Sequence, residues 1–350
     1  MKSLQWIVVL AAAGVALALS LLTQGCGSPA AKSREVVIYT ALDRQFSEPI
    51  LRAFEERTGI SVRAVYDAEA VKTVGLVNRL IAERERPQAD LFWNNEVVRS
   101  IQLRREGLTE PYDSPSAEAI PAAQKDSDGH WVGFAARARV FLVNTDLLPD
   151  EADHPSRVED LLDPEWKGRF AFAKPLFGTT STHAALIRSM LPGEDEAFWQ
   201  GVIDNGVMLA GNAQCRDAVA DGELAWCWTD TDDAHGALLD GKPVRMIYPT
   251  AVPGHDGVFL IPNSLVRIKG GPNPAEAQEL IDYLLSEEVE AALALERGAQ
   301  IPLRARVPGP PALEPLDPSR VLAVDWDAVA DELAESAAAL DKLLGPKGAK

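Results

Sequence analysis

The sequence predicts an α/β protein of two lobes, each an α/β domain, joined by two extended crossing segments. Residues 36–107 alternate short runs of β-branched and aromatic residues with amphipathic stretches, and this strand–helix succession predicts a mostly parallel sheet. A second set of the same kind occupies residues 169–239. Long, largely extended segments at residues 131–143 and 244–266 flank the second set. A chain that passes twice between two such sets predicts a clamp with a cleft between its lobes.

The first lobe begins with a run that is apolar throughout. Residues 36–39 are typical of a strand buried on both faces. Phe46, Ile50 and Phe54 then share one helical face, and Gly59 is a typical helix stop. The other elements expected here are a strand at residues 60–65, a helix at 71–86, a strand at 90–93 and a helix that ends near Gly107.

The second lobe and the C-terminal part follow from the same patterns. The expected elements are a strand at 169–172, helices at 182–190 and 196–205, a strand at 224–228, and helices at 232–239, 274–285, 287–297 and 325–344. Residues 304–318 hold five prolines, which is typical of an extended linker. The expected organisation is residues 35–132 with about 255–300 as lobe 1, about 140–245 as lobe 2, and 301–350 as a proline-rich linker and C-terminal helix.

The N-terminus predicts export. Lys2 precedes an apolar run at residues 7–22, and Gly25 then stands directly before Cys26. A small residue before a cysteine after a short apolar run looks like a lipoprotein signal, with residues 1–25 removed, acyl chains on Cys26 and residues 26–34 as a tether. The alternatives are an ordinary signal peptide or an uncleaved anchor, although the run is shorter than the ~20 residues that a bilayer helix needs. We expect a lipid-anchored protein that faces the periplasm or the cell exterior.

Composition and motifs exclude several functions. A net charge of −18 argues against a nucleic-acid partner and against electrostatic adhesion to anionic lipid. The sequence holds no Gly-x-Ser-x-Gly, His-Glu-x-x-His or phosphate-binding Gly-Lys-Ser/Thr motif, so we expect no enzyme. Cys215 and Cys227 are the other two cysteines, and in an oxidising compartment they predict a disulfide. Two buried free thiols are the alternative, because spacing alone does not show that the cysteines meet.

Short motifs spread over the chain form one recognisable series. The series is Val37-Ile38-Tyr39-Thr40, Ala89-Asp90-Leu91-Phe92-Trp93, Trp131-Val132-Gly133-Phe134, Arg137-Ala138-Arg139-Val140, Ile261-Pro262-Asn263-Ser264 and Ile301-Pro302-Leu303-Arg304. In this order it resembles the extracellular solute-binding proteins of ABC importers, in the branch that includes the ferric-iron binders. The resemblance implies a two-lobed periplasmic-binding-protein fold of type II that closes on one small solute and delivers it to a permease with its ATPase. We expect a monomer. A solute sensor that docks to a membrane receptor would use the same clamp.

One part of the family pattern is absent. Ferric binders of this family carry adjacent tyrosines just after a strand that follows a Gly-Glu turn. Here that segment is residues 222–233, and it holds no tyrosine. The first-lobe histidine of the family is also replaced, with Asp43 nearest to its place. Coordination of iron by phenolates is therefore not available at the expected position.

Acidic residues fill the same segment. Asp230, Asp232 and Asp233 follow the strand together with Thr229. Carboxylates in a cleft would be hard oxygen ligands for a metal cation or partners for an ammonium group. The alternative is that these residues cap the next helix and complement its dipole.

An anion site is predicted beside them. Thr179, Thr180 and Ser181 lie between a strand and a helix, where free N–H groups and hydroxyls bind anions, unless they form a plain capped helix start. Arg137 matches the family's arginine that meets a small anion, and a guanidinium suits a planar oxyanion. The alternative for Arg137 is a solvated or ion-paired side chain.

Loops of the first lobe should complete the site, because ligands of open α/β sheets bind beyond the carboxyl ends of the strands. The candidates are Asp43, Glu69, Asn94, Asn95 and Glu96, each of which is by itself also a plausible helix cap. The preferred ligand is a ferric-type cation with a small anion. Asp43, Glu69 and Asp230 would supply oxygens to the metal, while Arg137 and the Thr179-Thr180 helix start would hold the anion. The rival ligand is an organic oxyanion such as a phosphonate or a thiamine-like compound.

Overall fold

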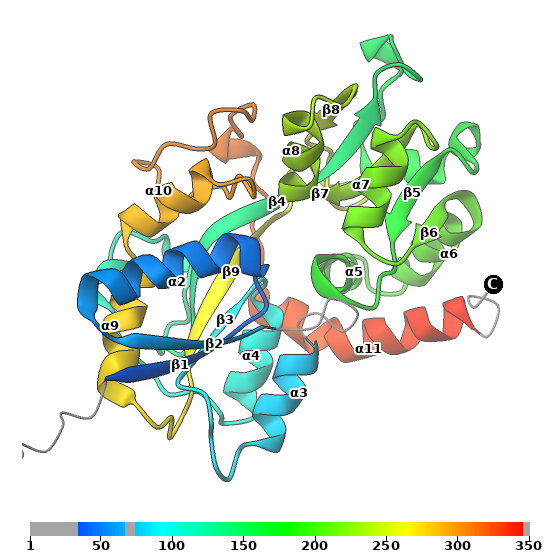
Figure 1. The fold of residues 1–350 in the computed structure, drawn as a ribbon. Helices are drawn as coiled ribbons and strands as arrows, with labels where there is room; N and C mark the ends of the chain where they lie inside the picture. Colours follow the sequence, from blue (N-terminus) through cyan, green and yellow to red (C-terminus); the bar gives the residue numbers. More distant parts are fainter. Residues whose placement is uncertain (1–33, 67–73, 346–350) are drawn as a thin grey trace, which may run out of the picture. The chain divides into compact units, whose positions relative to one another are not determined.

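A curved mixed sheet forms the centre of the protein. The computed structural model describes residues 34–66 and 74–345, and the described residues from Glu35 onward belong to one compact unit. Nine strands run in the order β2-β1-β3-β9-β4-β7-β5-β6, with β8 paired to β4 off this path (Figure 1). The predicted signal peptide, Cys26 and Glu69 lie outside the described residues.

The first lobe has the predicted strand–helix succession. Its parallel strands are β1 (Glu35–Thr40), β2 (Ser61–Tyr66) and β3 (Leu91–Asn94), connected by α2 (Arg44–Thr58) and α3 (Val74–Ala82). Phe46, Ile50 and Phe54 are buried on one face of α2, as their spacing predicts. Gly59 ends this helix in the left-handed region, with φ of 70°, where a side chain would be strained.

Strand β4 (Val132–Asn144) is the first predicted crossing segment. Its first part pairs with β9 (Leu260–Arg267), and its second part pairs with β7 and with β8 (Val244–Ile247). All thirteen residues of β4 are buried, since the strand runs through the sheets of both lobes. The second predicted crossing, 244–266, is not one extended segment. Pro249, Pro253 and two glycines with positive φ break it between β8 and β9.

The second lobe repeats the alternation of strands and helices. Its parallel strands are β5 (Phe170–Ala173), β6 (Val207–Leu209) and β7 (Trp226–Asp230), and its helices are α5 (Gly178–Met190), α6 (Asp195–Asn205), α7 (Asn212–Ala220) and α8 (Thr231–Leu239). Strand β6 was not predicted, because three residues carry too little periodicity. Helix α5 begins four residues before the predicted start, so the candidate anion-binding residues form its first turn.

The remaining helices cover the sheet and the junction of the lobes. They are α4 (Val98–Arg105), α9 (Pro274–Leu284), α10 (Glu287–Leu295) and α11 (Trp326–Leu344), with short 3-10 turns at Pro115–Ala117, Ala122–Gln124, Glu151–Asp153, Val158–Leu162, Pro164–Trp166 and Pro318–Arg320. Helix α11 packs against α4 of the first lobe and against α5 and α6 of the second (Figure 1). Ion pairs of Arg105 with Asp331 and of Arg188 with Glu332 add to these contacts. The C-terminal helix therefore links the two lobes.

A bulge interrupts β4 where it passes from lobe to lobe. The pairing register with β9 shifts between Phe134 and Ala136, and Ala135 has a positive φ of 39°. The buried carboxylate of Glu290 accepts the Ala135 N–H at 3.2 Å. The buried amide of Asn263 donates to the Ala135 carbonyl. Buried polar side chains thus stabilise a backbone conformation that an alanine rarely adopts.

The predicted disulfide is not formed. Cys215 of α7 and Cys227 of β7 are free thiols, both fully buried in one apolar cluster. Burial raises the pKa of Cys215 to about 12 and raises the pKa of Cys227 well above its ordinary value. In such a tightly packed layer a thiol acts as a small hydrophobic side chain. The alternative of two buried free thiols is therefore what the structure contains.

We expect both thiols to resist alkylation in the folded protein. The thiolate is the reactive form, and burial disfavours it at both positions. Mass spectrometry of peptides containing Cys215 and Cys227 should show no modification by iodoacetamide under native conditions. Both should react fully in guanidinium without a reductant. Cysteines that react in denaturant only after reduction would contradict this prediction.

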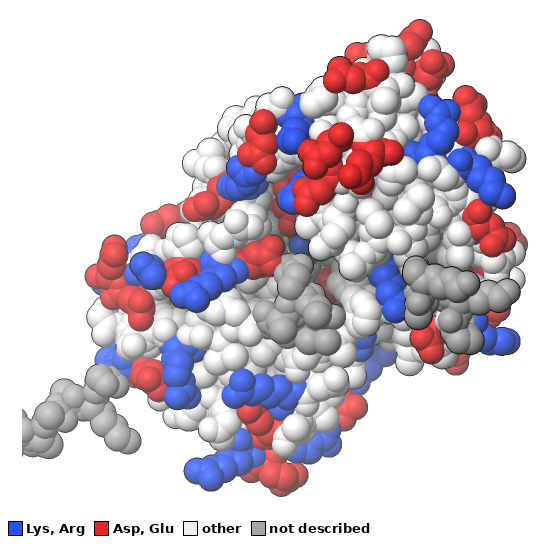
Figure 2. Space-filling view, turned by 45° about the vertical axis from the view of Figure 1, so that its right-hand side comes forward, with Lys and Arg blue, Asp and Glu red and all other residues white. Residues whose placement is uncertain are grey.

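Surface charge agrees with the composition. On the face that Figure 2 draws, acidic and basic side chains are interspersed, and acidic ones gather in the upper part. This distribution fits the formal net charge of −18. Among the described residues, no helix is both long and apolar enough to cross a membrane.

Candidate functional site

Two adjoining cavities lie between the lobes. The larger has a volume of about 500 Å³, and the smaller has a volume of about 130 Å³. Four residues line both of them: Asp43 after β1, Ala213 in α7, and Asp232 and Asp233 in α8. Because the first of these belongs to the first lobe and the others to the second, the cavities form two parts of one cleft.

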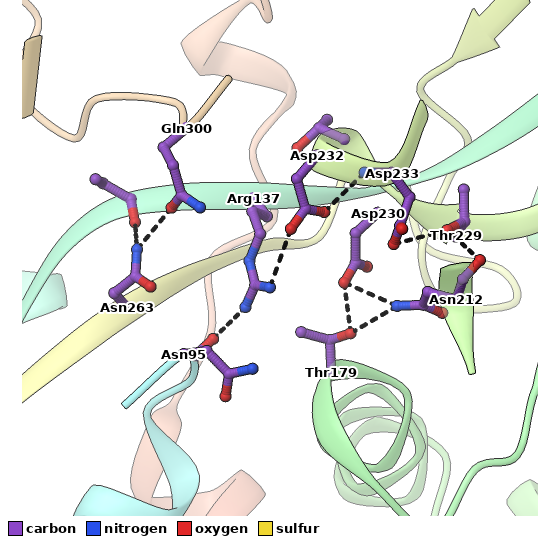
Figure 3. Close-up of polar contacts among 12 residues, drawn as sticks. Asn95, Arg137, Thr179, Asn212, Thr229, Asp230, Asp232, Asp233, Asn263 and Gln300 are labelled. Atoms are coloured by element: carbon purple, nitrogen blue, oxygen red, sulfur yellow. Dashed lines mark hydrogen bonds and ion pairs between the residues drawn. The ribbon is translucent and has the colours of Figure 1, made fainter. Parts of the chain in front are cut away.

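Three carboxylates converge on this cleft. Asp230 ends β7, and Asp232 and Asp233 lie in the first turn of α8 (Figure 3). One oxygen from each lies within 4.8 Å of the others. The side chain of Asp230, the residue before α8, makes no capping hydrogen bond. Capping therefore does not explain this carboxylate.

Asp230 is held by a buried arginine. Arg139 Nη1 donates to Asp230 Oδ1 at 2.5 Å, and both side chains are almost fully buried. Thr179 Oγ1 and Asn212 Nδ2 donate to Asp230 Oδ2 at 2.6 and 3.0 Å (Figure 3). Asp230 thereby joins the N-terminal turns of α5 and α7 to β7. Its carboxylate already accepts three hydrogen bonds, so Asp232 and Asp233 are the more accessible members of the cluster.

Arg137 lies in the cleft and is paired rather than solvated. Its Nη2 donates to the Asn95 carbonyl of the first lobe, and its Nη1 lies 3.4 Å from Asp232 Oδ2. Burial alone would lower the pKa of this guanidinium. Its pKa is nevertheless raised, because the carboxylates of Asp232, Asp230 and Asp43 lie nearby. Arg137 therefore stays charged and connects the lobes at the cleft.

The first turn of α5 forms another wall of the smaller cavity. Gly178, Thr179 and Thr180 line it together with Asn212. Ser181, also predicted to bind the ligand, is not among its lining residues and donates instead to the Gly178 carbonyl at 3.0 Å. Thr179 and Thr180 therefore lie at the wall of the smaller cavity, in the kind of helix N-terminal turn that can bind an anion.

The predicted residues of the first lobe separate into two groups. Asp43 and Asn95 line the smaller cavity. Asn94 and Glu96 line neither of the two cleft cavities and are fully buried. Asn94 donates to Glu96 at 2.7 Å, and Glu96 accepts the Val98 N–H at 2.6 Å. Burial raises the pKa of Glu96. The contacts of Glu96 are those of a helix cap at the start of α4. Capping was the alternative interpretation given for each candidate of the first lobe.

Three further residues contact the acidic cluster. Thr229, predicted to bind the ligand, lines neither cavity and instead donates to Asp233 Oδ2 at 3.3 Å. Arg139 and Asn212 were not predicted as site residues. Side chains two positions apart in a strand point to the same face, so the sequence places Arg139 on the face of Arg137. This spacing is a signal that could have identified Arg139 as a site residue. The contact of Asn212 with Asp230 depends on folding and has no such signal.

The two-lobed α/β fold with a polar cleft between its lobes defines a solute-binding protein of the periplasmic-binding type. The chain belongs to the family described as bacterial extracellular solute-binding protein, whose model matches residues 89–332. This assignment confirms the class of protein that the motif series predicted.

Relatives and solved structures agree with the assignment. Iron uptake protein A1 of Synechocystis sp. is 27% identical over 296 residues, which cover 79% of this chain and 78% of the relative. An Fe(3+)-binding periplasmic protein of Serratia marcescens is 30% identical over 217 residues, 60% of this chain and 61% of the relative. The crystal structure of iron-bound HitA from Pseudomonas aeruginosa superposes with a TM-score of 0.80 at 24% identity, covering 89% of this chain and 99% of HitA. This structural match confirms the predicted fold.

Proposed function

We propose that this protein is the substrate-binding component of an ABC importer and that it captures a ferric-type cation with a small anion between its lobes. The observation that carries the proposal is the set of three carboxylates whose oxygens lie within 4.8 Å of one another at the cleft. Clustered carboxylate oxygens are hard ligands and suit a small, highly charged cation. The names of the Synechocystis and Serratia relatives support iron as the cargo.

Asp232 and Asp233 are the best-placed ligands in this proposal. They lie in the segment where ferric binders of this family carry adjacent tyrosines, so carboxylates would replace phenolates at the metal. Asp43 reaches the same cleft from the first lobe and would add an oxygen. Ligands from both lobes would let a bound cation hold the clamp closed.

The anion would lie at the smaller cavity. Arg137 keeps its charge there, and the N-terminal turn of α5 presents Thr179 and Thr180. A helix N-terminus together with a guanidinium favours a small oxyanion. The anion would complete the coordination of the metal and offset part of its charge.

The remaining parts of the proposal concern location and partners. Residues 1–25 would be removed as a lipoprotein signal, and acyl chains on Cys26 would attach the protein to the membrane through residues 26–34. Lobe 1 would consist of residues 35–132 with about 255–300 and lobe 2 of about 140–245, with 301–350 as a linker and C-terminal helix. The protein would act as a monomer that meets a permease and its ATPase.

The double substitution Asp232→Asn with Asp233→Asn tests the cation site. Loss of outer partners of a metal site typically costs 10–100-fold in affinity, so loss of two direct ligands should weaken ferric binding by more than about 100-fold. The measurement is competition against a ferric chelator, with metal-stripped protein and with carbonate or citrate as the anion. Asp221→Asn removes a surface carboxylate paired with Lys242 and should leave binding unchanged.

Two results would contradict the proposal. Unchanged ferric binding by the double variant would move the metal away from the acidic cluster. Failure of the unsubstituted protein to bind ferric ion with either anion would end the metal proposal. The cleft would then be assigned to an organic oxyanion, such as a phosphonate or a thiamine-like compound.

A further inference from the structure

Two buried histidines each follow a candidate ligand residue of the second lobe by one helical turn. His183 comes four positions after Thr179 in α5, and His235 comes three positions after Asp232 in α8. Residues three or four apart lie on the same side of a helix. His183 has no exposed surface, His235 is 5% exposed, and neither lines the two cleft cavities. An effect of either histidine on binding would therefore act through the helical turn before it.

The ring of His183 contacts the chain that connects the lobes. Its Nε2 lies 2.8 Å from the carbonyl oxygen of Ala251, in the connection from β8 to β9. Burial lowers the pKa of His183 well below its ordinary value, and the nearby Arg139 lowers it further, so the ring is neutral at neutral pH. A carbonyl oxygen only accepts hydrogen bonds, so the single ring proton lies on Nε2 and is donated to Ala251. His183 thereby ties α5 to the segment that leads into the first lobe.

The ring of His235 makes a corresponding contact with the first lobe. Its Nδ1 lies 2.8 Å from the carbonyl oxygen of Arg297, just after α10, and α10 packs against α2 and α9. By the same argument, His235 Nδ1 carries a proton and donates it. The Arg297 side chain also reaches α8, where its Nη2 lies 2.7 Å from Asp240, but this ion pair is exposed and contributes little energy. The His235 contact is a buried link between α8 and the first lobe.

We propose that His183 and His235 are positioning residues for solute binding. Each would fix the ligand-carrying turn of its helix against a backbone carbonyl that lies outside the second lobe. The turn with Thr179 and Thr180 depends on His183, and the turn with Asp232 and Asp233 depends on His235. The orientation of both turns is thus coupled to the placement of the lobes. The inference rests on the proposed function for the identity of the solute, whereas the positioning itself is a property of the ligand-free protein.

Leucine and amide substitutions test the two hydrogen bonds. His183→Leu and His235→Leu remove the donor, while His183→Gln and His235→Asn place an amide N–H near the lost ring nitrogen. Affinity for ferric ion with carbonate is measured by competition against a chelator on metal-stripped protein. Each leucine variant should bind about tenfold more weakly, the effect of one lost buried hydrogen bond, and each amide variant should recover most of the affinity.

The matched control is a histidine with the same kind of contact away from the cleft. His154 Nε2 lies 2.9 Å from the Leu148 carbonyl oxygen, and His154 lines neither cleft cavity. His154→Leu should leave the affinity unchanged.

Hydrogen exchange of the ligand-free protein tests the positioning without a ferric ligand. Peptides within residues 178–190 should exchange faster in His183→Leu, and peptides within residues 231–239 should do so in His235→Leu. Unchanged affinity and exchange in the leucine variants would overturn the inference, as would folded amide variants that bind as weakly as the leucine variants. If the unsubstituted protein binds no ferric ion, the proposed function fails, and the exchange result alone decides whether the histidines position the two turns.

Discussion

Replacing Glu290 with glutamine should lower the free energy of unfolding by about 3–5 kcal/mol, the usual cost of removing one partner of a buried ion pair. Glu290 is fully buried, and its Oε2 lies 2.7 Å from Nη1 of the buried Arg304. Without the negative charge, the Arg304 guanidinium would stay charged in the interior with only neutral partners among the described residues, such as the carbonyls of Ser116 and Leu285.

The same carboxylate stabilises the bulge in the crossing strand. Glu290 Oε1 accepts the N–H groups of Ala135 and Leu303 at 3.2 and 2.8 Å. Ala135 has a positive φ that needs such support. The substitution should therefore weaken the junction between the lobes as well as the first lobe itself.

Urea denaturation of the two proteins at neutral pH measures the effect. The matched control is Glu288→Gln, two positions away on α10, because Glu288 pairs with Arg57 in solvent. Solvent-exposed ion pairs contribute little to the free energy of unfolding, so this control should leave stability nearly unchanged. A Glu290→Gln protein as stable as the control would show that the buried pair does not support the fold.

Replacing Asp230 with asparagine should also destabilise the protein by about 3–5 kcal/mol. Arg139 would keep its charge beside the apolar ring of Trp228, with its guanidinium carbon 5.1 Å from the ring centre. Thr179 and Asn212 would lose the oxygen that joins α5 and α7 to β7. Weaker ligand binding is expected as a consequence, because the first turn of α5, the proposed anion site, would no longer be held in place.

Denaturation and ligand titration together separate these effects. The control Asp221→Asn, on the surface of the same lobe, should leave the free energy of unfolding and the ligand affinity unchanged. The pair Arg139→Met with Asp230→Leu should recover part of the lost stability, since it removes both buried charges. If Asp230→Asn abolished ferric binding at full stability, Asp230 would be a direct metal ligand, as the sequence predicted, rather than mainly a support for the cleft.

The candidate site could be predicted in part. Sheet topology predicted Asp43 and Asn95, a helix start predicted Thr179 and Thr180, the acidic cluster predicted Asp230, and the family resemblance predicted Arg137. All six line the smaller cavity. Topology does not decide which side chain of a loop turns toward the cleft. Glu96 follows the same strand as Asn95, yet its carboxylate turns into α4 and caps that helix.

The sequence by itself determined the elements with strong local patterns. The buried strand β1, the helix α2 with its stop at Gly59 and the fully buried crossing strand β4 all have bounds close to those predicted. Hydrophobic period and helix-stop chemistry act between near neighbours, so they can be read from the chain alone. The family motifs determined the class of protein in the same way.

Only the tertiary structure decided which buried charges pair with one another and whether the two thiols are bonded. Arg139 and Asp230 are 91 positions apart, and Glu290 and Ala135 are 155 positions apart. Cys215 and Cys227 lie close in sequence, and in the structure they are free thiols within one apolar cluster. Whether a charged side chain is solvated, paired or a ligand depends on what distant segments bring to it. The burial that results sets the energy of each pair, and no local pattern in the sequence carries that information.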